Sequence, residues 1–200
     1  MTIAEFRGSP QARQRYWARA HIGWRRILAA RPNAGHRALA ALQQAGVLRA
    51  IITQNVDGLH QAAGARDVVE LHGALDRVVC LACGARSPRQ ALDRRLRAAN
   101  PELDCDEVPA RHPDGDAELA EGQLARVQRC FALLDSSASL LVLGSSLTAM
   151  SGLRFVHRAR QAQIPVAIVN RGATRGDPLA DLKLDAPLGH VLPTLTGAPQ

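Results

Sequence analysis

The chain has 200 residues and an apolar share of 46%, which suits one core-forming domain or one domain with a small appendage. No apolar run approaches the ~20 residues that a membrane helix needs, and no signal peptide opens the chain, so we expect no membrane partner. The net charge of +7 comes from arginines spread along the chain without a nucleic-acid reading motif, so we expect no nucleic-acid partner. Cysteines in a chain without an export signal indicate a cytoplasmic, reducing location.

The first third of the chain predicts helices around two short buried strands. Apolar residues at three- and four-residue spacing predict the helices, and β-branched runs predict the strands. The helices are expected over Ala4 to Arg31, Gly35 to Gln44 (closed by Gly46) and Leu59 to Ala63, and the strands over Val47 to Thr53 and Val68 to Leu71.

The rest of the chain predicts a small insert and then a return to alternating strands and helices. Val78 to Arg86 resembles a metal knuckle, Ala91 to Ala99 a charged helix, and Asn100 to Gly122 a polar loop rich in proline and acidic residues. The later elements are helices over Leu124 to Leu134 and Gly152 to Gln163 (with Ser151 as N-cap), and strands over Ser139 to Gly144 and Val166 to Asn170.

Alternation of helices with apolar strands predicts an α/β fold with a doubly wound parallel sheet. Ligands of such sheets bind beyond the carboxyl ends of the strands. Polar or glycine residues follow three of the predicted strands, at Gln54-Asn55, at Gly144-Ser145-Ser146 and at Asn170-Arg171-Gly172. The sequence therefore predicts a ligand site at this edge of the sheet.

Several of these residues have both a chemical and a structural interpretation. Free backbone N–H groups at Gly144 to Ser146 suit a phosphate, although such a turn is often only structural. Asn170 suits a ribose hydroxyl or caps its own turn. His72, between a strand and a glycine, is the best candidate for a general base because imidazole accepts protons near neutral pH.

Cys80 and Cys83 have the spacing of a zinc knuckle. A structural zinc needs four ligands, and the remaining cysteines stand alone. Cys130 lies in a helical pattern beside Phe131, where a buried thiol is the simpler interpretation. Cys105 and His112 are further candidates that nothing in the pattern favours.

Taken together, these motifs resemble the sirtuins, the family of NAD-dependent protein-lysine deacylases. The resemblance rests on Thr53 to His60, Glu70 to Gly73, the cysteine pair, Gly144 to Leu147 and Val169 to Gly172. Arg15 to Arg19 and Pro113 to Asp116 resemble the class II branch. The match extends over nearly the whole chain.

The resemblance implies a Rossmann-like domain over 1–73 and 124–200, a small zinc-knuckle insert over 74–123, and an acyl-lysine protein as substrate. By this resemblance His72 is the general base, acting on a ribose hydroxyl of NAD. The residues implied to contact NAD are Gln54, Asn55, Val56, Asp57, Gly144, Ser145, Ser146, Asn170, Arg171, Gly172 and Leu188, and those implied for zinc are Cys80 and Cys83. Leu188 falls where the class II pattern has a cysteine against the adenine.

The sequence also departs from the family pattern. The Gly-Ala-Gly-x-Ser loop that receives the pyrophosphate, a second Cys-x-x-Cys and the strand that pairs with the substrate are not found, so we expect an N-terminal truncation, an internal deletion near Gly122 and an incomplete sheet and zinc site. We therefore predict weak or absent NAD binding and little deacylase activity in this form. The alternatives to an active deacylase are a catalytically impaired nucleotide-binding module and a shortened product that folds poorly. Oligomeric state and acyl-group preference are not indicated.

Overall fold

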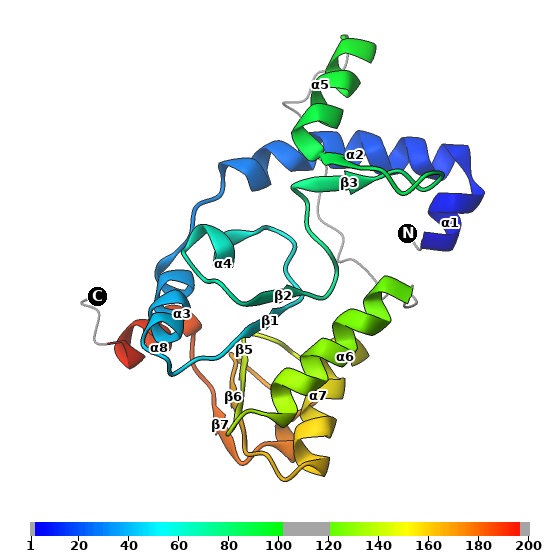
Figure 1. The fold of residues 1–200 in the computed structure, drawn as a ribbon. Helices are drawn as coiled ribbons and strands as arrows, with labels where there is room; N and C mark the ends of the chain where they lie inside the picture. The colour runs from blue at the N-terminus through cyan, green and yellow to red at the C-terminus, as the bar shows by residue number, and fades with distance from the viewer. Residues whose placement is uncertain (1–2, 102–120, 197–200) are drawn as a thin grey trace. The chain divides into compact units, whose positions relative to one another are not determined.

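The computed structural model describes residues 3–101 and 121–196, and the chain divides into two compact units (Figure 1). The larger unit comprises residues 32–54, 59–71 and 119–200, and the smaller unit comprises residues 1–31, 55–58 and 72–118. The N-terminal helices thus group with the segment that carries Cys80 and Cys83. The domain bounds expected from the sequence differ in this respect and stay a prediction.

The larger unit contains most of the strands and helices that the sequence predicts. β7 and α8 are additional elements that the sequence pattern did not indicate. In chain order the elements are α3 (Ala34–Gln44), β1 (Ile51–Thr53), α4 (Leu59–Ala62), β2 (Val68–Glu70), α6 (Glu121–Asp135), β5 (Leu140–Leu143), α7 (Met150–Gln161), β6 (Val166–Val169), the 3-10 helix η1 (Asp177–Leu179), β7 (Leu182–Leu184) and α8 (Leu188–Leu195).

The strands of the larger unit form two parallel sheets, which confirms the α/β class. In one sheet β1 pairs with β2, with Ile51 opposite Val68. In the other sheet the strand order is β5-β6-β7, with Leu140 opposite Val166. Within residues 3–101 and 121–196, β1 pairs only with β2 and β5 pairs only with β6. One edge of β1 and one edge of β5 therefore have no ladder partner in the described part of the chain.

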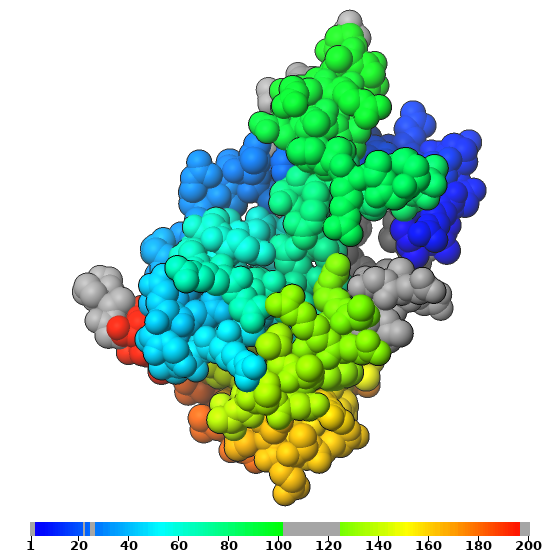
Figure 2. All heavy atoms as spheres, in the orientation of Figure 1, coloured from blue at the N-terminus to red at the C-terminus, as the bar shows by residue number. Residues whose placement is uncertain are grey.

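Two apolar cores cover opposite faces of these strands. Ile51 and Val68 belong to a core with α3 and α8, whereas the next residues along, Ile52 and Val69, face a core with α6 and α7. Successive side chains of a strand point to opposite faces, so this alternation means that both faces are covered. Figure 1 shows α3 and α8 on one side of the strands and α6 and α7 on the other, and Figure 2 shows the atoms of α6 and α7 packed together.

The first strand is shorter than the pattern predicted, because Val47 to Ala50 lie outside β1. The backbone N–H groups of Val47 and Leu48 both donate to the carbonyl oxygen of Leu42, at 3.0 and 3.1 Å. These bonds close the C-terminus of α3, where Gly46 has a φ of +74°. The first part of the predicted strand, Val47 and Leu48, therefore closes the preceding helix, and only Ile51 to Thr53 form the strand.

The smaller unit consists of α1 (Ile3–Gly8), α2 (Pro10–Ala29), the antiparallel hairpin of β3 (Arg77–Val79) and β4 (Arg86–Pro88), and α5 (Arg89–Ala99). The helical character expected over Ala4 to Arg31 is confirmed, and the structure divides this stretch into two helices at Ser9. The Ser9 hydroxyl accepts from the Ala12 N–H at 3.2 Å, and Pro10 occupies the first helical position. A serine N-cap followed by proline is a helix start signal.

Polar side chains occupy the interior of the smaller unit. His21 Nδ1 lies 2.7 Å from Asp93 Oδ1, and Arg97 Nε donates to Asp93 Oδ2 at 2.9 Å. The Arg89 guanidinium lies between Trp17 and Trp24, 5.3 and 5.4 Å from the ring centroids. The His21–Asp93 contact and the cation–π attraction of Arg89 join α2 to α5.

Most of the predicted loop from Asn100 to Gly122 lies outside the described residues, and α6 begins at Glu121, inside its predicted end. Among the helices of residues 3–101 and 121–196, none combines the length and apolar character needed to cross a bilayer.

Candidate active site

Gln54 is the first residue after β1, and its carboxamide is held in place. Its Nε2 donates to the Ser151 hydroxyl at 2.7 Å. A Cβ on Gly152 would lie 3.3 Å from the same nitrogen, so the glycine makes room for the carboxamide. The expectation that Ser151 caps α7 is wrong, because Ala149 is the N-cap and no side chain caps that end. Ser151 lies within the first turn and orients Gln54 instead.

The Gly144-Ser145-Ser146 turn follows β5 and adopts a conformation that requires glycine at its start. Gly144 has a φ of +60°, and a Cβ there would lie 2.7 Å from Leu188 Cδ1. Leu188, at the first turn of α8, therefore lies directly against the turn, as expected if both line one ligand site. Gly144 and Ser146 are exposed, but the Gly144 N–H already donates to the Val169 carbonyl oxygen at 3.0 Å, so the expectation of free backbone N–H groups does not hold at Gly144.

The residue after this turn is strained, which fixes the turn's shape. Leu147 has a φ of 55° although it is not glycine, and its side chain is buried. Its N–H donates to the Ser145 hydroxyl at 3.2 Å, and the hydroxyls of Ser146 and Thr148 lie 2.9 Å apart. Strained residues of this kind persist only where the surroundings hold them, and they concentrate at functional sites.

Asn170 follows β6 and caps the turn Asn170-Arg171-Gly172. Its Nδ2 donates to the carbonyl oxygens of Arg171 and Gly172, at 3.0 and 3.2 Å. Among the described residues Oδ1 of Asn170 has no hydrogen-bond partner, so it is available to accept from a hydroxyl. The structural role of Asn170 is therefore present, and the expected ribose contact is compatible with it.

The turns after β5 and β6 are bonded to each other. The Arg175 N–H donates to the Ser146 carbonyl oxygen at 2.9 Å, and Arg175 Nη1 donates to the Thr148 carbonyl oxygen at 3.2 Å. Hydrogen bonds from the Thr174 hydroxyl and N–H, followed by one from Lys183, lower the pKa of Asp177 to about 2. The turns after β5 and β6 are thus joined by hydrogen bonds.

The remaining predicted residues, Asn55, Val56, Asp57 and His72, lie in the smaller unit, and the division between the units falls after Gln54. The Leu75 N–H donates to the Val56 carbonyl oxygen at 2.9 Å, which brings the segment after His72 beside the Asn-Val-Asp segment. Gly73, with a φ of +81°, allows the chain to turn directly after His72. His72 is exposed and forms no hydrogen bond or ion pair within the described residues, so its imidazole is accessible to a ligand.

Cys80 and Cys83 lie in the connection between β3 and β4 and are both exposed. The Cys80 N–H donates to the Ala85 carbonyl oxygen at 2.8 Å, and the Gly84 N–H donates to the Cys80 carbonyl oxygen at 2.8 Å. Hydrogen bonds from the Cys83 and Ala82 backbones, and then from the Cys83 side chain, hold the pKa of Cys80 below its ordinary value. Backbone N–H groups aimed at a thiolate are what a metal knuckle provides.

The donor set does not fit a four-cysteine zinc site. Cys130 is fully buried in the core with α6 and α7, and burial raises the pKa of its thiol to about 11. Within the described residues, no group of three or more His, Cys, Asp or Glu side chains is placed to hold a metal. Cys105 and His112 lie outside the described residues.

Sequence reasoning missed the residues that hold the site residues in place. Ser151 orients Gln54, Arg175 joins two turns, and Lys183 bonds to the Gly172 carbonyl oxygen. The only available signal was the single lysine in a chain whose other basic residues are arginine and histidine. These partners lie in a helix, a loop and a strand, so spacing along the chain does not reveal them.

A model of the Sir2 family matches residues 3–151. NAD-dependent protein deacetylase 1 of Streptomyces coelicolor is 50% identical over 223 residues, which cover 98% of this chain and 74% of that protein. NAD-dependent protein deacetylase 1 of Mycobacterium avium is 46% identical over 225 residues, covering 98% of this chain and 80% of that protein.

The fold is similar to solved sirtuin structures. The structure of Sir2 bound to acetylated peptide has a TM-score of 0.80 at 26% identity and covers 98% of this chain and 81% of its own. The complex of Sir2 with a p53 peptide and NAD+ has a TM-score of 0.79 at 27% identity. The match covers 98% of this chain and 80% of that chain. The family match, the close relatives and the polar strand ends agree, and the chain belongs to the Sir2 family.

Proposed function

We propose that this chain is an NAD-dependent protein deacetylase. The observation that carries the proposal is the 50% identity, over 98% of the chain, to a relative named for that activity. The polar strand ends and the unpaired imidazole of His72 support it, because they are the chemical groups that the reaction needs. The substrate class that follows is an acyl-lysine protein, as a relative of known structure was solved with an acetylated peptide.

In this proposal His72 is the general base. Its exposed imidazole accepts a proton from a ribose hydroxyl, since a neutral histidine is a good acceptor near pH 7. When bound, NAD supplies the anomeric carbon that receives the acyl oxygen as nicotinamide leaves. Asn55, Val56 and Asp57 orient the reacting groups together with Gln54, whose carboxamide is already held by Ser151.

The remaining proposed NAD contacts come from the strand ends of the larger unit. The turn of Gly144, Ser145 and Ser146 contacts phosphate and ribose, with the serine hydroxyls as its hydrogen-bonding groups. Oδ1 of Asn170, with the Arg171-Gly172 backbone, accepts from the adenosine ribose. Leu188 contributes an apolar contact beside Gly144.

We propose that zinc, if held, is bound by Cys80 and Cys83 and lacks the full four-thiolate shell. The burial of Cys130 in the core of the larger unit supports this. No step of the reaction is assigned to the metal.

A catalytically impaired, nucleotide-binding form is the second candidate function. It is favoured by an internal shortening, which we propose because the stretches of 223 and 225 residues matched with the two relatives exceed the 200 residues of the whole chain. The two parallel sheets are then parts of one doubly wound, Rossmann-like sheet that is incomplete between β1 and β5. The lack of pairing between these strands in the described residues supports that arrangement. Assignment to the class II branch rests on Arg15 to Arg19 alone within the described residues, and the cytoplasmic location stays a prediction.

Nicotinamide release from NAD with an acetyl-lysine peptide tests the proposal. We expect release by the wild-type chain and at least a ~100-fold loss in His72→Ala, because a general base contributes about 10²–10⁴-fold. His157→Ala is the matched control, since His157 is exposed on α7 and lies outside the proposed site. Undiminished release by His72→Ala contradicts the assignment of the base. Calorimetric binding of ADP-ribose without any release by the wild-type chain supports the second candidate.

A further inference from the structure

Lys183 is the only lysine of the chain, and it bonds to the turn proposed to contact the adenosine ribose. It lies on β7, where Ile168 of β6 is opposite it. Its ammonium donates to the Gly172 carbonyl oxygen at 2.9 Å and to Asp177 Oδ1 at 2.9 Å. The Lys183 side chain is 24% exposed, so solvent only partly screens these contacts.

Asp177 extends this contact along the loop after β6. It accepts from the Thr174 N–H at 2.9 Å and also from the Thr174 hydroxyl. The Gly172 N–H donates to Asp185 Oδ1 at 3.1 Å. Both ends of the segment from Gly172 to Asp177 are thus bonded to charged groups, and the Lys183 ammonium contacts both ends.

The same segment holds the neighbouring turn after β5. The Arg175 N–H and side chain donate to the carbonyl oxygens of Ser146 and Thr148. A Cβ on Gly176 would lie 2.4 Å from Leu147 Cδ1, so the segment also packs tightly against the strained residue of that turn. A displacement of the segment would therefore move both turns that are proposed to bind the nucleotide.

The chemistry of lysine fits this position better than that of arginine. An ammonium is a compact point charge whose three N–H groups point in different directions, whereas a guanidinium is a planar fork suited to one carboxylate. Lys183 bonds to a carbonyl oxygen and a carboxylate from separate parts of the loop. In a chain that otherwise uses arginine as its long cation, a lysine stands where these two acceptors meet.

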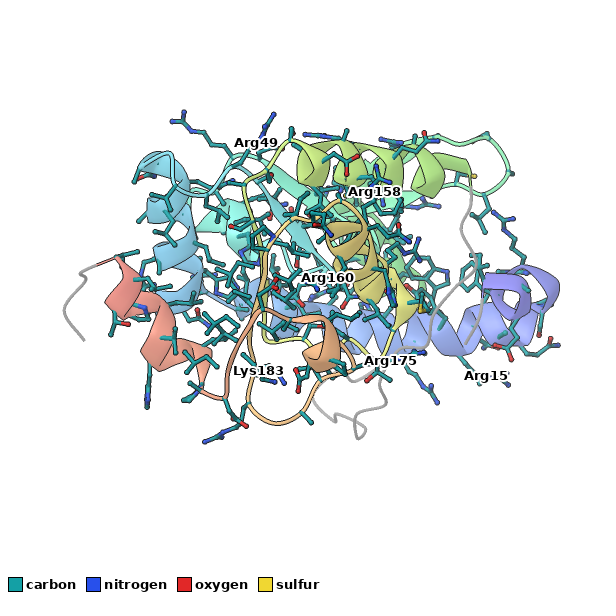
Figure 3. All side chains as sticks on the ribbon, turned by 90° about the horizontal axis from the view of Figure 1, so that it is seen from below. Arg15, Arg49, Arg158, Arg160, Arg175 and Lys183 are labelled. Carbon is teal, nitrogen blue, oxygen red and sulfur yellow. The ribbon has the colours of Figure 1, made fainter. Side chains whose placement is uncertain are left out.

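We propose that Lys183 is a positioning residue for nucleotide binding: by holding Gly172 and Asp177 it fixes the turn after β6 and, through Arg175, the turn after β5. This inference rests on the proposed function for its effect on NAD. Lys183 itself is assigned no contact with NAD. Figure 3 labels Lys183, Arg175 and a control residue, Arg160.

The first test compares Lys183→Met with Lys183→Arg and Arg160→Met. Arg160 forms an ion pair with Asp181 at 2.8 Å, close to the 2.9 Å of the Lys183–Asp177 pair, on the surface of the same unit. We expect the KM for NAD and the calorimetric Kd of ADP-ribose to rise about tenfold in Lys183→Met with kcat little changed, because a hydrogen bond to a charged group is lost. Lys183→Arg should recover part of the affinity, and Arg160→Met should match the wild-type chain.

The second test does not depend on the proposed function. Deuterium exchange of the backbone amides of Thr174 and Arg175 should accelerate in Lys183→Met and not in Arg160→Met. Unchanged exchange in Lys183→Met contradicts the inference, and so does an unchanged Kd. An equal loss of kcat in Lys183→Met and Arg160→Met also contradicts it. If Lys183→Met does not fold, Asp177→Asn removes the same ion pair and is expected to give the same faster exchange. Faster exchange in a chain that binds no nucleotide keeps the positioning role of Lys183 and contradicts the proposed function.

Discussion

Different kinds of side chain fill the interiors of the two units. In the larger unit Ile168, Val156 and Cys130 are completely buried, and two apolar cores cover the strands. Among the described side chains of the smaller unit, the buried apolar ones are Ala12 and Trp24. His21, Arg89 and Asp93 are buried beside them.

This difference indicates which kind of change each unit tolerates. An apolar core responds mainly to lost volume, whereas a buried polar network responds to the loss of one partner, because the remaining groups keep their desolvation penalty. The two tryptophans of the chain, Trp17 and Trp24, both lie in α2. Tryptophan fluorescence therefore reports the smaller unit, while far-UV circular dichroism reports both.

The largest effect is expected in the core of the larger unit. Ile168→Ala should lower the free energy of unfolding by about 2–5 kcal/mol, because the side chain is 0% exposed and leaves a cavity. Urea unfolding followed by circular dichroism measures this loss. Leu141→Ala, on the neighbouring strand and 37% exposed, is the control and should cost clearly less. Equal losses would mean that β5 and β6 do not differ in burial as described.

Asp93→Asn is expected to have a smaller effect, confined to the smaller unit. The substitution removes the carboxylate shared by His21 and Arg97, and a hydrogen bond to a charged group is worth about 1.5–3 kcal/mol. Urea unfolding followed by tryptophan fluorescence should show the loss. Asp76→Asn breaks the Arg77 pair, whose carboxylate is 70% exposed, and should change little.

The same pair of variants has a predicted pH dependence. Burial raises the pKa of Asp93, but the hydrogen bond and charge of Arg97, with those of His21, outweigh it and leave the pKa below its ordinary value. A carboxylate with a depressed pKa stabilises the fold above its unfolded pKa of about 4, and this stability is lost as the pH falls below that value. The loss of unfolding free energy in Asp93→Asn should therefore be complete at pH 7 and become smaller below about pH 4. A deficit that grows on acidification would contradict this network.

The smallest effect is expected from metal removal. The described donors do not complete a four-cysteine site, so EDTA should leave the urea midpoint of unfolding, followed by tryptophan fluorescence, nearly unchanged. Elemental analysis should find less than one zinc per chain. Cys80→Ser should behave likewise. Stoichiometric zinc whose removal unfolds the smaller unit would mean that Cys105 or His112 completes the shell.

Local pattern was sufficient for elements whose signals lie within a few residues. The spacing of Ala38, Leu39 and Leu42 predicted α3, and the β-branched run from Val166 predicted β6. The same reasoning failed at β7, where Leu182 and Leu184 are 63% and 43% exposed, because the alternation of a three-residue strand is too short to indicate a strand. It failed at Ser151 as well, since a serine near a helix start has the same appearance whether it caps the helix or accepts from Gln54.

The sequence by itself determined the family resemblance, the α/β class and the strand ends that carry polar residues, because motif spacing and hydrophobic period are local properties. Only the tertiary structure decided that Leu188 lies against Gly144, that Ser151 holds Gln54 and that Lys183 joins Gly172 to Asp177. Each contact connects a residue that follows a strand with a residue of another helix or strand. They form only when parallel strands bring their carboxyl ends to one edge of a sheet.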